Sequence, residues 1–83
     1  MQRTAEEFVH ELPNGRWFVG DFLSTCRDGQ ATFLVERRPG GAVAEMSLSS
    51  IASAASGVRT YSAKASAKRA AQRMIERVLD EDL

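Results

Sequence analysis

The side chains best placed to do chemistry in this sequence are the cations of one acid-free stretch. Between Met46 and Ile75 the chain has no aspartate or glutamate, yet it carries five basic residues, Arg59, Lys64, Lys68, Arg69 and Arg73. The whole chain has no net charge, with 11 basic and 11 acidic residues, so its charge is segregated along the sequence. A local positive field on a neutral domain favours contact with phosphates or with an acidic protein surface.

The other reactive residue types do not form a catalytic or metal-binding pattern. His10 is the only histidine and Cys26 is the only cysteine, whereas a zinc site needs about four ligands of such types. Glu6 and Glu7 are adjacent, so on a helix they would diverge by about 100° and could not act as a paired acid and base. We therefore expect a binding module that is not an enzyme, with no catalytic residues, no metal and no cofactor.

Length and composition predict one small folded domain over residues 1–83. An apolar fraction of 43% and a charged fraction of 27% are typical of a folded soluble protein. The single cysteine allows no internal disulfide and favours a reducing compartment, so we expect a cytoplasmic protein. No apolar run approaches the roughly 20 residues that span a bilayer, and we expect no membrane partner.

An N-terminal helix is predicted by the run Thr4-Ala5-Glu6-Glu7, which matches a capping box. In that motif the Thr4 hydroxyl accepts a hydrogen bond from the Glu7 backbone N–H. Apolar residues follow at helical spacing as far as Leu12. Pro13 should then end a helix of roughly eight residues.

Three strands in an antiparallel meander are predicted next. Composition and alternation place them at residues 16–24, 30–38 and 42–48. The turns between them are predicted at Arg27-Asp28-Gly29 and Pro39-Gly40-Gly41. These short connections make neighbouring strands antiparallel.

The longest helix is predicted over residues 63–79, with Ser62 as its N-cap. A connector at 49–56 is expected to hold a short helix, and residues 58–61 a short extended segment. The apolar stripe of the last helix includes the small residues Ala67 and Ala71, which would let it lie close to the sheet. The predicted fold is therefore α+β, a two-layer sandwich in which a three-stranded antiparallel meander carries the N- and C-terminal helices on one face.

The order of these elements and the start of the last helix resemble the double-stranded-RNA-binding domain (dsRBD). That family has an αβββα fold, and its last helix begins with a lysine- and alanine-rich motif that grips phosphates. The resemblance implies that Lys64, Lys68 and Arg69 contact phosphates. The family's loop between the first two strands, with its Gly-Pro and histidine, has no counterpart here. The matching residues are Lys64-Ala65-Ser66-Ala67-Lys68-Arg69-Ala70-Ala71.

The junction before this helix carries a second likeness. The run from Arg59 to Ala67 is similar to the strand-to-helix junction of the arm-binding domains of phage-type integrases. Those domains bind nucleic acid through an open sheet face, so the likeness also implies a nucleic-acid partner.

The first strand has apolar residues on both faces, although one face of a two-layer sandwich should be polar. The face with Phe18 and Phe22, separated by a shallow depression at Gly20, is a candidate surface for bases, a partner protein or a second copy of the chain. Arg37 and Arg38 lie near strand ends and could rim it. Alternatively, the connector at 49–56 folds over this face.

The leading functional hypothesis is a module that binds the phosphates of nucleic acid, RNA or DNA, through the basic C-terminal helix. The alternative is a protein-interaction module, such as a small phage- or mobile-element-type inhibitor similar to anti-CRISPR proteins, that docks on another protein machine. In a third reading the basic face is only solvated, with Arg73 and Arg77 paired to Glu76 and Glu81.

Overall fold

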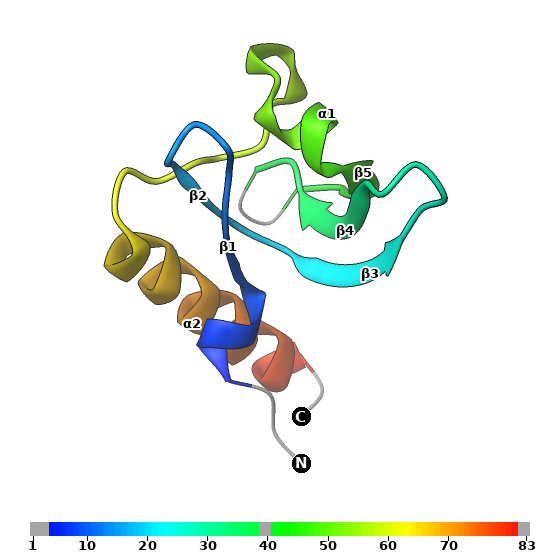
Figure 1. Ribbon diagram of the computed structural model, residues 1–83. Coiled ribbons are helices and arrows are strands. Elements are labelled where there is room, and N and C mark those ends of the chain that lie inside the picture. The colour runs from blue at the N-terminus through cyan, green and yellow to red at the C-terminus, as the bar shows by residue number, and fades with distance from the viewer. Residues whose placement is uncertain (1–3, 39–40, 82–83) are drawn as a thin grey trace.

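The chain folds into two small antiparallel sheets, each with a helix packed against it (Figure 1). The computed structural model describes residues 4–38 and 41–81. The α+β class, the three-stranded meander β3-β4-β5 and the helices at the two ends confirm the prediction, and the β1-β2 hairpin adds a second sheet. The elements in chain order are the 3-10 turn η1 (Ala5–Phe8), β1 (Val9–Glu11), β2 (Trp17–Val19), β3 (Asp21–Thr25), β4 (Ala31–Glu36), β5 (Val43–Ser47), α1 (Leu48–Ala52), the 3-10 turn η2 (Ala54–Ser56) and α2 (Lys64–Glu81).

The first predicted strand, 16–24, is divided into two because the chain passes from one sheet to the other at Gly20. β2 precedes this residue and pairs with β1, and β3 follows it and pairs with β4. The Gly20 N–H donates to the Phe8 carbonyl at 2.8 Å, and the Gly20 carbonyl lies 2.9 Å from His10 Nε2. These bonds hold the crossing point against η1 and β1.

Gly20 is buried, and the space around it is already filled. A Cβ at this position would lie 2.7 Å from Val35 Cγ1 and 3.3 Å from Phe18 Cε2. Any larger residue would therefore push the two sheets apart. The prediction of a depression beside Gly20 is wrong, because the side chains of Val35 and Phe18 occupy that space.

The N-terminal helix is a single 3-10 turn and does not continue to Pro13. The Thr4 side chain makes no cap hydrogen bond, and the Glu7 N–H donates instead to the Thr4 backbone carbonyl at 3.1 Å. The chain then becomes β1 because β2 offers it backbone partners across a tight turn at Gly15, whose φ is +83°. A helix of two turns has too few internal hydrogen bonds to compete with such pairing.

The hydrophobic core has two parts, one on each face of the β1-β2 hairpin. Alternate residues of β2 serve both parts, with Phe18 in the first core and Trp17 in the second, which explains why this strand is apolar on both faces. The first core lies among the hairpin, the meander and α1 and contains Leu12, Phe18, Phe33, Val35 and Ile51. The second core lies between the hairpin and α2 and contains Ala5, Val9, Ala67 and Ala71, with Trp17 and Val19 packed against it.

The connector at 49–56 covers the face that was a candidate contact surface. Ile51 of α1 packs in the same cluster as Phe18, and both side chains are fully buried. The assignment of Phe18 to a contact surface is therefore wrong, because the connector folds over this part of the face, whereas Phe22 stays 49% exposed. The short helix expected here is also confirmed, since Ser47 caps α1 by accepting from the Ser50 N–H at 3.3 Å.

The last helix packs on the two-stranded sheet and on η1, where the prediction placed it on the meander. Ala67 and Ala71 are fully buried at this contact, because their small side chains let the helix approach closely. α2 begins at Lys64, two residues after the predicted cap Ser62. The extended segment before it forms an isolated bridge, in which Tyr61 exchanges two 2.8 Å backbone hydrogen bonds with Trp17. None of the described helices is long and apolar enough to cross a membrane.

Candidate functional site

The basic residues of the acid-free stretch do not form one free positive face. Lys64 Nζ lies 2.9 Å from one carboxylate oxygen of Glu6, and Lys68 Nζ lies 3.7 Å from the other. Glu6 belongs to η1, which packs beside the start of α2. The Lys64 hydrogen bond, followed by the charges of the two lysines, lowers the pKa of the Glu6 carboxyl. An acid that is distant in sequence thus offsets the two lysines in space.

Lys64 makes a second contact within the domain. Its Nζ lies 5.6 Å from the centroid of the Trp17 ring, within the range of a cation–π interaction. A ligand phosphate would therefore have to compete with both Glu6 and Trp17 for this ammonium group. Lys64 and Lys68 are the lysines that the dsRBD resemblance assigned to phosphate contacts.

The three arginines of the stretch are exposed and differ in their surroundings. Arg69 donates to Ser66 Oγ at 3.3 Å, and the Arg59 guanidinium lies 5.8 Å from the centroid of the Tyr61 ring. Among the described side chains, those of residues 4–38 and 41–77, neither Arg59 nor Arg73 has an acidic partner. The pairing of Arg73 with Glu76 is not formed.

The residues next along α2 are engaged differently from the sequence prediction. Glu76 accepts a hydrogen bond from Gln72 Nε2 at 3.4 Å. Arg77 reaches across to β4, where its Nη2 lies 3.3 Å from a Glu36 carboxylate oxygen. The described contacts of Arg77 therefore link α2 to the meander, and the side chain of Glu81, its predicted partner, lies outside the described residues.

The remaining predicted contact residues are not brought together. Phe22 is 49% exposed and packs its edge against Phe33, with ring centroids 5.7 Å apart. Phe33 is the strand partner of Phe22, and Arg37 follows it by four residues, which is about 13 Å along an antiparallel strand. Arg37 and Arg38 are exposed beyond the end of β4, and they do not rim a surface centred on Phe22.

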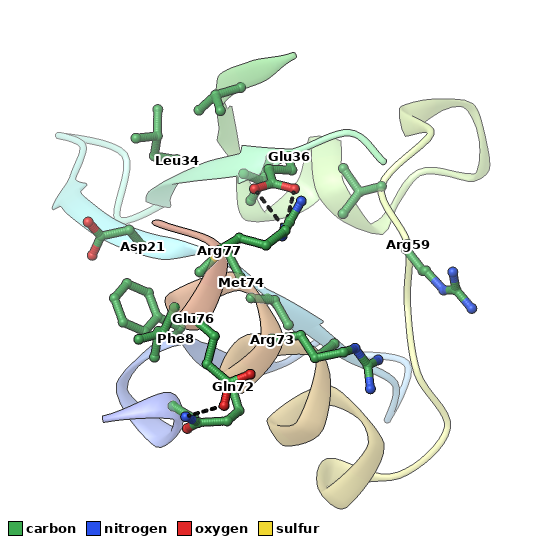
Figure 2. A pocket seen from close by; sticks show the side chains of 18 of the residues that line it. Phe8, Asp21, Leu34, Glu36, Arg59, Gln72, Arg73, Met74, Glu76 and Arg77 are labelled. Carbon is green, nitrogen blue, oxygen red and sulfur yellow. Dashed lines mark hydrogen bonds and ion pairs between the residues drawn. The ribbon is translucent and has the colours of Figure 1, made fainter. Parts of the chain in front are cut away.

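A cleft of about 1360 Å³ lies between α2 and the two sheets, and Figure 2 shows it from close by. We call it the α2–sheet cleft. It exists because the helix contacts the hairpin closely at Ala67 and Ala71 but stands away from the meander further along, so that Met74 and Ile75 are only half-buried. Its apolar lining includes Phe8, Val19, Leu34, Val43, Met74 and Ile75.

The outer face of the meander supplies one wall of this cleft. Leu34 lies between the buried residues Phe33 and Val35 along β4, so its side chain points away from the first core. Leu34 is 40% exposed and Val43 on β5 is 56% exposed. The ion pair of Glu36 with Arg77 joins this wall to the helix (Figure 2).

Charged side chains lie on the rim of the cleft at different places. In the view of Figure 2, Arg59 and Arg73 extend their guanidinium groups to the right, whereas Asp21 lies at the left beside Phe8. The right-hand end therefore carries two cations without acidic partners among the described side chains. Charge and apolar surface meet there, which favours a ligand that has both.

The apolar residues of this wall are visible in the sequence as exceptions to the alternation of the strands. The alternation of residues 30–38 places Leu34 on the same face as Thr32 and Glu36, and that of residues 42–48 places Val43 on the same face as Glu45. An apolar residue on the polar side of each of two neighbouring strands indicates that this side of the sheet contacts another part of the protein or a partner. The position of the cleft itself depends on where α2 docks, which no local pattern gives.

Comparison with protein-family models, with curated proteins and with solved structures gave no match. In the part of the chain that the structure describes, no group of three or more His, Cys, Asp and Glu side chains could hold a metal ion. The resemblance to the dsRBD stays a prediction.

Proposed function

We propose that this domain is a protein-interaction module that docks a segment of another protein in the α2–sheet cleft. The observation that carries the proposal is the exposure of Leu34 and Val43, at 40% and 56%, on a concave wall that α2 does not cover. A volume of about 1360 Å³ exceeds the roughly 300–1,000 Å³ of small-molecule pockets. An open apolar cleft of this size suits a peptide segment. Inhibition of another protein machine is one outcome that such docking would have.

Two leucines of nearly equal exposure allow a matched test. Leu34 (40% exposed) lines the cleft, whereas Leu23 (43% exposed) lies on β3 outside it. A displayed library of random twelve-residue peptides, selected on the wild-type domain, should yield binders that Leu34→Lys weakens at least about three- to eightfold, because burial of the exposed 40% of a leucine contributes about 0.6–1.2 kcal/mol. Leu23→Lys should leave the same binders unaffected. Failure to select any peptide, or equal losses in both variants, would refute the proposal.

Nucleic-acid binding is the second candidate, and one observation favours it. Arg69 and Arg73 are exposed one turn apart on α2 and have no acidic partner among the described side chains of residues 4–38 and 41–77. Against it, Glu6 offsets Lys64 and Lys68, and the chain has no net charge, whereas nucleic-acid-binding domains commonly have a basic excess.

Gel shifts with duplex RNA, duplex DNA and single strands across a salt gradient test this candidate. Glu6→Gln removes the carboxylate that holds the two lysines, so a true phosphate binder should bind more tightly and show a steeper dependence on salt. If neither the wild type nor Glu6→Gln shows salt-sensitive binding, this candidate is eliminated.

A further inference from the structure

We infer that the partner segment carries a carboxylate at the end of the α2–sheet cleft formed by Arg59 and Arg73, next to apolar side chains that fill the cleft. This inference rests on the proposed function and gives the chemistry of its partner. It follows from which cations of the cleft are already engaged and which are not.

Arg77 is excluded as the partner's contact because it is engaged within the domain. Its guanidinium lies 3.3 Å from the Glu36 carboxylate, and this pair crosses from α2 to β4. Arg73 lies one helical turn before Arg77, about 6 Å along the axis, and its guanidinium has no hydrogen bond or ion pair with the described side chains of residues 4–38 and 41–77. Arg73 can therefore accept a new acidic partner without losing an existing one.

Arg59 reaches the same cleft from a different element. It lies on the segment that leads to α2, and its guanidinium faces the Tyr61 ring at 5.8 Å. A guanidinium on an aromatic ring keeps its N–H groups free for a carboxylate. In Figure 2 the guanidinium groups of Arg59 and Arg73 extend to the same side of the cleft. Two arginines from two elements give this end a fixed positive character.

The neighbouring apolar residues make the two arginines more selective than they would be on an open surface. Met74 follows Arg73 directly on α2, and the wall with Leu34 and Val43 is part of the same cleft. A segment that covers these side chains removes water from the arginine end, where a carboxylate is then stabilised and a lysine is repelled.

The test uses the displayed twelve-residue library with the intact domain. Peptides selected on the wild type are depleted on Leu34→Lys, so that the remaining binders are those that use the cleft. We expect these binders to combine apolar residues with aspartate or glutamate. Arg73→Glu should weaken them about tenfold or more, and Arg59→Glu should act in the same direction, because each replaces an attraction with a repulsion.

Arg69→Glu is the matched control, since it makes the same charge change on the same helix outside the cleft. It should weaken binding clearly less than Arg73→Glu does, because Arg69 does not line the cleft and its charge, about 6 Å further along the helix axis, stays exposed to water and salt. A binder whose acid is replaced by lysine should regain affinity for Arg73→Glu, which a merely misfolded variant would not show. Circular dichroism confirms that each variant is folded.

The outcomes separate the two proposals. Cleft-dependent binders that lack acids, or that Arg73→Glu and Arg69→Glu weaken equally, overturn the carboxylate inference and leave the docking proposal intact. The absence of any binder sensitive to Leu34→Lys overturns both. A concentration-dependent dimer in sedimentation that Leu34→Lys abolishes would assign the cleft to a second copy of the chain and would also overturn the inference.

Discussion

Two phenylalanines that contact the same ring, Phe33, provide a sharp test of the divided core. Phe18 has no exposed surface and meets Phe33 edge-on, with ring centroids 5.1 Å apart. Phe22 meets the same ring at 5.7 Å but is 49% exposed. Truncation of each to alanine removes the same atoms from two different environments, so the difference in stability measures burial.

The magnitudes follow from these exposures. Loss of a fully buried phenylalanine side chain costs about 3–5 kcal/mol. Phe22 has about half of that burial, so Phe22→Ala should cost about 1.5–2.5 kcal/mol. A domain of 83 residues has a total stability of about 4–12 kcal/mol, so Phe18→Ala removes a large part of it. A difference of about 2 kcal/mol corresponds to a gap of roughly 8–16 °C between the two midpoints of thermal unfolding.

Thermal melts followed by circular dichroism and by the fluorescence of Trp17 measure this gap. Trp17 is the only tryptophan and packs against the second core, so it reports whether loss of Phe18 in the first core unfolds the whole domain. Equal midpoints for the two variants would refute the placement of Phe18 between the hairpin and α1. A lower midpoint for Phe22→Ala than for Phe18→Ala would refute it as well.

Two further predictions concern the crossing point of the sheets and its histidine. Gly20→Ala should lower the free energy of unfolding by about 1–3 kcal/mol, because the added Cβ would contact Val35 Cγ1. This loss should be smaller in a Val35→Ala background. If thermal melts show that the effects of the two substitutions simply add, the two side chains do not crowd each other. Burial lowers the pKa of His10 below its ordinary value of about 6.5, partly offset by the Gly20 carbonyl and Asp21, so the folded state prefers the neutral ring. Stability from this group is present above about pH 6.5 and is lost as the pH falls through the lower folded-state pKa, whereas His10→Gln should show a flat melting midpoint between about pH 7 and pH 5. A wild-type midpoint that is equally flat over that interval would contradict the burial of the ring.

The sequence was most informative where a pattern is local. Alternation in residues 30–38 and 42–48 gave the meander, and Leu48, Ile51 and Ala52 at helical spacing gave α1. The small residues Ala67 and Ala71 correctly marked the close contact face of the last helix. In each case the side chains that face the core recur at the period of the strand or helix, so this period appears directly in the sequence.

The errors arise where distant segments meet. Val9 and Leu12 fit a helical spacing, yet strand pairing across the Asn14-Gly15 turn won, and that dipeptide is itself a hairpin signal. The acid-free stretch was a true feature of the sequence, but Glu6 lies against Lys64 in space. No composition count along the chain can show a charge pair that tertiary packing creates.

The division of the core at the β1-β2 hairpin also has a consequence for the order of assembly. The buried residues of the first core all lie between Leu12 and Ile51, so this part can form before α2 docks. Formation of the second core must bring η1 to α2, as in the hydrogen bond that Lys64 donates to Glu6 across 58 positions. It therefore costs more loop-closure entropy than formation of the first core. We therefore expect α2 to detach first when the domain opens locally, with its amide protons exchanging faster than those of β4. Since α2 is one wall of the cleft, a partner bound there would slow this exchange and increase the population of the closed domain.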